Sequence, residues 1–167
     1  KGESEVSHIT GNNGGKIIIT KTMNAPSSEN PGNLGAIITS GQNLGSVTIS
    51  RGHESQTNGI GIDGSVLRYF DISPANNLLL NATFRFHYFD AELNGFDENT
   101  LMMWKSTANL IWTPQLFTSR NTTSNYVEKT LISDFSRWTL SGASNIPVPV
   151  QFSLFNVRCD GNKIIIN

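Results

Sequence analysis

Alternation of apolar and polar side chains in the segment LLLNATFRFHYF, residues 78–89, constrains the fold of this chain more than any other feature. One parity is apolar and comprises Leu78, Leu80, Ala82, Phe84, Phe86 and Tyr88. A repeat of two residues is typical of a β-strand with one face in the core and the other in solvent. Gly, Pro or Asn interrupts every window that might keep helical spacing, so the sequence predicts an all-β fold.

Short segments of this kind recur along the chain, separated by clusters of turn-forming residues. We expect strands at Lys16–Met23, Leu34–Ser40, Leu44–His53, Ser65–Ile72, Leu78–Phe89, Thr100–Ser106, Asn109–Thr113, Gln115–Arg120, Asn125–Glu128 and Phe135–Ser141. Many short strands without crossover helices predict an antiparallel two-sheet β-sandwich of the jelly-roll kind. The fourth of these segments is apolar on both parities, which favours a central strand.

Composition limits the classes of partner. Charged residues make up 15% of the 167 residues, with 12 Lys and Arg against 13 Asp and Glu, so no field is strong enough to recruit nucleic acid or an anionic membrane. The sequence contains no run of 18 or more apolar residues, so no transmembrane helix is predicted. Cys159 is the single cysteine, which leaves no intrachain disulfide. Neutral polar residues supply the solubility, as in many extracellular β-proteins, and we predict a secreted or cell-surface protein.

The segment LSGASNIPVPV predicts a domain boundary, because its two prolines interrupt strand pairing and stiffen a connector. We assign residues 1–145 to the sandwich and residues 146–167 to a linker and a hairpin. A turn at Asp160 and Gly161 would pair Cys159 with Asn162, Val157 with Ile164 and Phe155 with Ile166. Such a ribbon is marginal alone, so we expect it to join a further sheet.

Several segments resemble, in order, a module of large secreted proteins of Bacteroidota. They are GSVLRYFDISP, ATFRFHYFDAELNGFDENTLMMWKS, NLIWTP, SRWTLS and PVPVQFSLFNVRCDGNKIIIN, and the resemblance as a whole covers roughly Gly45 to Asn167. In that family the module lies just upstream of the C-terminal region used by the type IX secretion system. The resemblance implies that the final hairpin is the first strand pair of a following immunoglobulin-like domain, that the chain continues beyond Asn167, and that no catalytic activity is attached.

The stretch DAELNGFDEN, residues 90–99, is the most acidic part of the chain. Asp90, Glu92 and Asn94 imitate the first half of an oxygen-ligand calcium loop, and they are the candidate metal ligands. The pattern fails at its twelfth position, where Leu101 replaces the bidentate Glu. In the alternative reading Asn94 and Gly95 form a turn between strands and the acids are solvated. No other cofactor is predicted.

Aromatic side chains are the candidate ligand platforms, since sugars stack on exposed rings. The tryptophans are Trp104, Trp112 and Trp138, and tryptophan in a β-sandwich is more often part of the core. Trp112 lies next to Pro114 near a turn and is therefore the candidate glycan-binding residue. If all three rings are buried, the sequence favours a spacer over a glycan-binding module.

Other ionisable residues form no convincing active site. His8, His53 and His87 are scattered without metal-ligand spacing. We expect Arg68 and Asp71 to make an internal ion pair. Asp90 and Glu98 are kept as an alternative, the paired catalytic carboxylates of a hydrolase.

From these features we predict a non-enzymatic structural or adhesive module, working as a spacer, a stalk element or a subunit of an extracellular assembly. The alternative is a carbohydrate-binding module. Expected partners are other domains of the same polypeptide or neighbouring subunits and, in the alternative, surface glycans.

Overall fold

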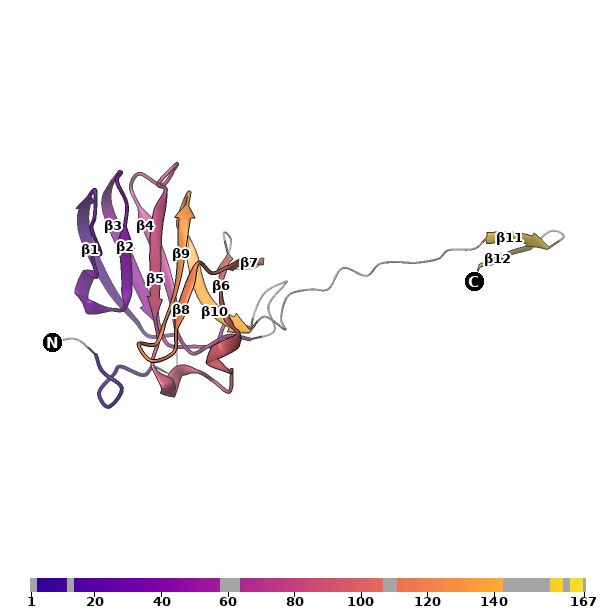
Figure 1. Ribbon diagram of the computed structural model, residues 1–167, viewed down its shortest axis with the longest axis horizontal. Coiled ribbons are helices and arrows are strands. Elements are labelled where there is room, and N and C mark those ends of the chain that lie inside the picture. The colour runs from indigo at the N-terminus through magenta and orange to yellow at the C-terminus, as the bar shows by residue number, and fades with distance from the viewer. Residues whose placement is uncertain are drawn as a thin grey trace.

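The computed structural model describes residues 3–11, 14–57, 64–106 and 111–142, together with the backbone of residues 157–160 and 163–166. In the first four ranges ten strands form two antiparallel sheets (Figure 1). One sheet contains, in spatial order, β1 (Lys16–Asn24), β3 (Asn43–Gly52), β4 (Tyr69–Pro74), β10 (Arg137–Gly142), β6 (Leu101–Ser106) and β7 (Trp112–Leu116). The other contains β2 (Ala36–Thr39), β5 (Ala82–His87), β9 (Tyr126–Ile132) and β8 (Ser119–Asn121).

Aromatic and aliphatic side chains from both sheets fill the space between them. Phe70 of β4 packs edge-on against Phe86 of β5 at 4.8 Å between ring centroids, and Phe84 packs against Trp138 of β10 at 5.7 Å. Residues 82–87 alternate strictly between buried and half-buried, as the period-two pattern requires. The predicted all-β two-sheet sandwich is confirmed, and β4 is a central strand as expected.

The strand expected over Leu78–Phe89 begins later than predicted. Leu78 and Leu79 are exposed, and the backbone of Leu79 and Asn81 has positive φ (53° and 44°). A residue in the left-handed region cannot continue a strand, so β5 starts only at Ala82. The pattern therefore predicted a buried Leu78, which is exposed, while the five later apolar positions are buried as predicted.

The segment expected as one strand over Gln115–Arg120 is divided between the two sheets. β7 ends at Leu116, whose φ of 60° turns the chain, and β8 begins at Ser119 in the opposite sheet. Pro114 lies inside β7, which is an edge strand, where a missing N–H disturbs no further pairing. Part of the expected strand Asn109–Thr113 lies outside the described residues.

A separate pair of strands, β11 (Val157–Asp160) and β12 (Lys163–Ile166), forms a two-stranded antiparallel sheet. Its register differs from the predicted one, because Cys159 lies opposite Ile164 and Asp160 opposite Lys163. Asp160 is therefore paired within the ribbon, where a turn residue was expected. The connector over residues 146–156 lies outside the described residues.

One end of the sandwich carries most of the irregular structure, and we call it the cleft end. β1 begins there and β10 ends there, because the register joins Lys16 to Gly52, Gly52 to Tyr69 and Tyr69 to Thr139. The short 3-10 helices η2 (Asp90–Glu92) and η3 (Glu98–Thr100) lie between β5 and β6, and η1 (Pro31–Asn33) precedes β2.

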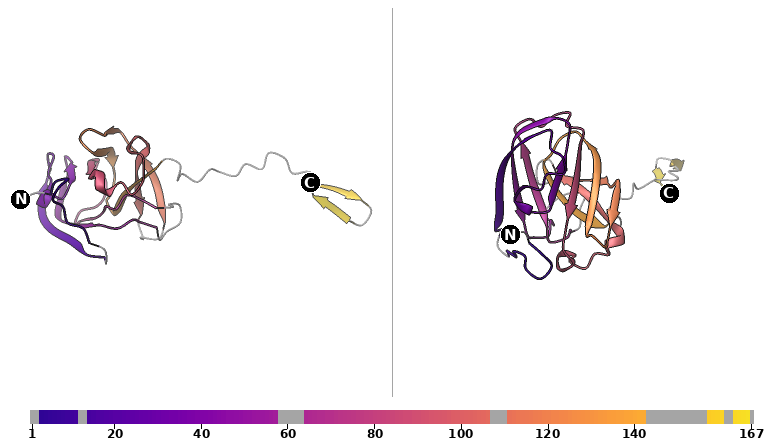
Figure 2. Two further views of the ribbon diagram at one scale, coloured as in Figure 1. Left: turned by 90° about the horizontal axis from the view of Figure 1, so that it is seen from below. Right: turned by 60° about the vertical axis from the view of Figure 1, so that its left-hand side comes forward.

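Residues Glu3–Gly11 run along the cleft end, and we call them the strap. In Figures 1 and 2 the strap is the indigo segment near the N-terminal label. Its only regular feature in the described residues is a bridge between Ser4 and Ser7. No helix among the described residues has the length and apolar character needed to cross a membrane.

Candidate functional site

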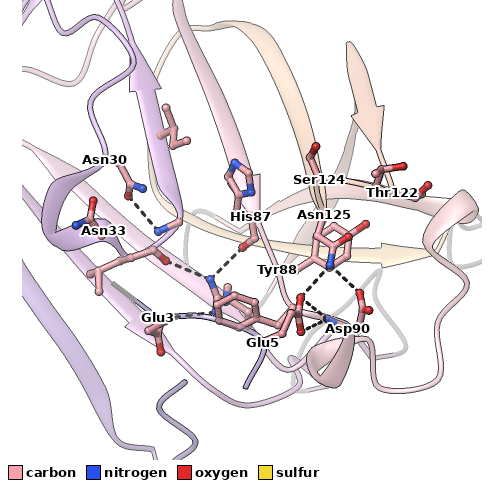
Figure 3. A pocket seen from close by; sticks show the side chains of 16 residues that line it. Glu3, Glu5, Asn30, Asn33, His87, Tyr88, Asp90, Thr122, Ser124 and Asn125 are labelled. Atoms are coloured by element: carbon pink, nitrogen blue, oxygen red, sulfur yellow. Dashed lines mark hydrogen bonds and ion pairs between the residues drawn. The ribbon is translucent and has the colours of Figure 1, made fainter. Parts of the chain in front are cut away.

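A cleft of about 580 Å³ opens at the cleft end, where four segments meet (Figure 3). The strap contributes Glu3 and Glu5, and the end of β5 contributes His87 and the three residues after it. The remaining lining residues are Asn30, Asn33, Leu34, Gly35, Ile37, Arg68, Thr122, Thr123, Ser124 and Asn125. Most of the lining residues have polar or charged side chains, so a ligand here would meet many hydrogen-bonding groups.

Beneath the cleft lies a buried ion cluster built on Glu92. Its carboxylate is fully buried and lies 2.6 Å from Arg51 Nη2 and 2.8 Å from Arg68 Nε. Glu92 also accepts a hydrogen bond from the backbone N–H of Phe89 at 3.0 Å, which fixes the η2 turn. His53 Nδ1 lies 3.3 Å from the same carboxylate. Burial is tolerated because each charge has a close partner of opposite sign.

Two further contacts complete the cluster. Glu3 of the strap places Oε1 3.0 Å from Arg51 Nη1 and Oε2 3.6 Å from Arg68 Nη2. Arg68 Nη1 donates to the backbone carbonyls of Leu34 and His87, and its guanidinium stacks over the Phe89 ring at 4.6 Å. Burial lowers the pKa of Arg68, and the carboxylate of Glu92 opposes that shift. An arginine stays charged at neutral pH even so, so two cations and two carboxylates balance.

The rim of the cleft is organised by a second acidic residue of the strap. Glu5 Oε2 accepts from the backbone N–H of Asp90 and Glu5 Oε1 from Asn125 Nδ2, both at 3.0 Å. Asn125 Nδ2 also donates to Asp90 Oδ1 at 2.6 Å. Burial lowers the pKa of His87, and the positive charge of Arg85 adds to this shift. His87 is therefore a neutral hydrogen-bonding group at neutral pH.

Some polar side chains of the lining are available for a ligand. Within the part of the chain that the structure describes, the side chains of Asn33, Thr122 and Ser124 have no hydrogen-bond partner. In Figure 3 Thr122 and Ser124 lie on the opposite side of the cleft from Glu3, whereas Asn33 lies beside Asn30, nearer to Glu3. The three free side chains offer neutral donors and acceptors to anything that enters.

The three predicted calcium ligands are not brought together. Glu92 points into the arginine pair, Asp90 accepts from Asn125, and Asn94 donates from Nδ2 to the carbonyl of Ser65 at 2.9 Å. A carboxylate already neutralised by two guanidinium groups has no charge to offer a hard cation. Asn94 and Gly95 do form a turn, with φ of 54° and 85°, but Glu92 is buried where that reading expected solvated acids. Among the described residues no three acidic, His or Cys side chains are grouped to hold a metal ion.

Trp112, the predicted glycan-stacking residue, is buried. Its side chain is 3% exposed and packs with Met102 and Trp104 in a small cluster of its own. Trp104 and Trp138 are also buried. A sugar stacks on an open ring face, so Trp112 is not available for it, and the prediction for this residue is corrected.

The other predicted groups take structural partners. Glu98 accepts a hydrogen bond from the Tyr88 hydroxyl at 2.9 Å, and burial raises the pKa of Tyr88 far above its usual value. Asp71 pairs with Arg137 at 2.6 Å, whereas Arg68 pairs with Glu92, so these two residues belong to separate ion pairs.

Sequence reasoning missed Arg51 and Glu3 as members of the site. Arg51 shares the parity of Val47 and Ile49 on β3, so the alternation itself placed a cation on the core face, and that signal was readable. Glu3 carries no such signal, because it lies outside every periodic segment.

Comparisons of the chain with protein-family models, with curated proteins and with solved structures find no match. Function is therefore inferred from the residues and their geometry.

Proposed function

We propose that this chain is a non-catalytic structural or adhesive module of a secreted bacterial surface protein. The observation that carries the proposal is that the carboxylates and arginines in and beneath the cleft already have partners within the fold. Glu92 holds both buried arginines, Glu5 and Asp90 share Asn125, and Glu98 holds Tyr88. An enzyme needs a nucleophile, an acid or a base with an open face toward its substrate.

The ordered resemblance to modules upstream of the type IX sorting region supports export to the cell surface, and the low charge supports an extracellular setting. The partners in this proposal are other domains of the same polypeptide or neighbouring subunits.

Deletion of the module from the parent protein in the source bacterium tests the proposal. We expect the protein still to reach the surface fraction while cell attachment or assembly of the surface structure is lost. As a matched control, Asp90→Asn and Glu98→Gln in the intact protein should leave attachment unchanged. Hydrolytic activity of the purified module that disappears in either variant would contradict the proposal.

One observation favours glycan binding as a second candidate. The open amide and hydroxyl groups of Asn33, Thr122 and Ser124 match the mixed donors and acceptors of a neutral sugar. A glycan array screened with the purified chain tests it. We expect any glycan that binds to be lost in Asn33→Ala and Ser124→Ala and kept in Thr113→Ala, which lies on β7 outside the cleft. An array without a hit would remove this candidate.

A further inference from the structure

Five exposed apolar side chains lie at one corner of the sandwich, and we call this set the leucine corner. Each is between 40% and 84% exposed, and the set comprises Leu78, Leu79, Leu116, Phe117 and Leu131. β7 and β8 are edge strands of the two sheets, and Leu116 and Phe117 lie where the chain passes from one strand to the other. Both sheets therefore end at the leucine corner.

Hydrogen bonds between two threonines bring Phe117 and Leu131 together. The hydroxyls of Thr118 and Thr130 lie 3.0 Å apart, and the backbone N–H of Thr130 donates to the Thr118 hydroxyl at 3.1 Å. β8 and β9 are antiparallel, so the residue before Thr118 and the residue after Thr130 lie on the same side of this contact. These two residues are Phe117 and Leu131.

Leu78 and Leu79 approach the corner from the other side of β9. The backbone N–H of Leu80 donates to the carbonyl of Ser133 at 3.0 Å, just after the end of β9. Leu131 is two residues before Ser133, so the two leucines that precede Leu80 lie near it.

Three of the four leucines have a backbone conformation that leucine rarely adopts. φ is 53° at Leu79, 60° at Leu116 and 59° at Leu131, in the left-handed region where Gly and Asn are favoured. Leu116 and Leu131 each lie at a register shift of their strand pair, and such irregularities re-aim a side chain. Neither backbone preference nor burial accounts for leucine at these positions. Strained residues of this kind point to a function beyond the stability of the single chain.

The exposed apolar area is sufficient for a weak dimer. Together the five side chains expose on the order of 500 Å² of apolar surface, toward the upper end of the roughly 300–600 Å² of the largest patch on a typical monomer. Two copies that bury this surface against each other would remove on the order of 1,000 Å² from water, which is about the size at which a specific interface begins. An aliphatic surface is complementary to itself, so a second copy needs no matching pattern of charges.

We propose that the leucine corner is the contact surface of a weak symmetric dimer, in which the corner of a second copy covers it. A two-fold axis through the corner places the leucines of one copy on those of the other. Side chains that are exposed in the single chain are then buried, and this burial offsets the strain of their backbone. The surface goes beyond the proposed function, and a monomeric chain would leave the proposed export and attachment untouched.

Sedimentation velocity of the full chain over a range of concentrations tests the dimer. We expect the weight-average sedimentation coefficient to rise with concentration toward the value of a dimer. The double variant Leu79→Asn and Leu131→Asn should associate at least about tenfold more weakly, because two of the most exposed members of the corner become polar. In dilute solution, where both proteins are monomeric, its melting temperature should equal or exceed that of the unmodified chain, since Asn accepts the left-handed backbone more readily than Leu.

Two further variants separate the corner from other causes of association. Ile18→Thr is the matched control, because Ile18 is exposed on β1 at the opposite edge of the larger sheet, and its loss should leave the dimer unchanged. Leu78→Lys is a second disrupting variant at a residue whose backbone is not left-handed. It should also weaken the dimer, because it adds a charge to an apolar contact.

A chain that stays monomeric at the highest concentration overturns the second copy as the occupant. A dimer that persists in the folded double variant and in Leu78→Lys, or that Ile18→Thr weakens equally, overturns the leucine corner as the contact. A clear fall in the melting temperature of the dilute double variant would show that these leucines stabilise the chain's own fold, contrary to the proposal.

Discussion

Phe86 and Arg85 are neighbours on β5 with opposite surroundings. Phe86 is fully buried against Phe70, whereas Arg85 lies on the outer face, paired with Glu128 at 2.8 Å and stacked over Tyr126. We expect Phe86→Ala to lower the free energy of unfolding by about 3–5 kcal/mol through lost burial and a cavity. Arg85→Ala should cost about 1 kcal/mol or less, since its ion pair is partly exposed. Urea unfolding of both variants measures the difference, and equal losses would mean that the two faces are misassigned.

His87 should make stability depend on pH. Its pKa in the folded chain is lowered by burial and by Arg85, while Arg68 adds positive charge from below and Tyr126 packs against the ring. As pH falls below the ordinary histidine pKa of 6.5, the unfolded chain takes up the proton before the folded chain does. The unfolded state then binds more protons, so stability falls with falling pH.

His87→Asn should remove this part of the slope. We expect the melting temperature of the unmodified chain to fall more steeply than that of the variant between pH 7.5 and 5.5, as followed by circular dichroism. If the melting temperatures of the two proteins fell equally with pH across this range, His87 would keep its ordinary pKa in the fold.

At the scale of single elements, the contact between β3 and β4 depends on a residue without a side chain. Gly52 lies directly opposite Tyr69, and a Cβ at Gly52 would overlap the Tyr69 ring. The ring is held over this glycine by Arg137, 4.5 Å from its centroid. We expect Gly52→Ala to lower the free energy of unfolding by about 1–3 kcal/mol, because the ring must move from a packed position.

Gly41→Ala is the matched control, since nothing lies within 4 Å of its Cβ position and its backbone is not left-handed. Chemical unfolding of both variants should leave this control within about 0.5 kcal/mol of the unmodified chain. A similar loss in both variants would show that overlap with the Tyr69 ring is not the cause of the loss at Gly52.

The accuracy of sequence prediction also varies by element. β1, β3 and β6 lie within a residue or two of their expected bounds, because alternation against a core is a local property of the chain. The division between β7 and β8 depends on the backbone of Leu116, where an ordinary leucine gives no turn signal. The ion cluster joins residues up to 89 positions apart, since Arg51 pairs with both Glu3 and Glu92. Which residues form ion pairs depends on the tertiary fold, and the local sequence does not reveal it. Arg51, on a core parity, could have been suspected, and Arg68 was expected in an internal ion pair but with Asp71 as its partner.

At the scale of the whole molecule, the sandwich should fold without the C-terminal hairpin. In the described residues β11 and β12 pair only with each other. We expect a chain ending at residue 145 to keep the melting temperature of the full chain within about 2 °C, because no strand of either large sheet is lost. Differential scanning calorimetry measures this. A truncated chain that does not fold would show that residues 146–167 belong to the first sandwich and that the domain division is wrong.

The first and last strands of the sandwich also determine how it would respond to a pull. β1 begins and β10 ends at the cleft end, in the same sheet. Tension on the two flanking segments would therefore peel both strands from one end and break their hydrogen bonds one pair after another, instead of loading all of them in shear. While folded, a module pulled in this way adds little to the length of the tether, because both attachment points lie at the same end of the sheet. It would unfold at low force, and the unfolded chain would then lengthen the tether.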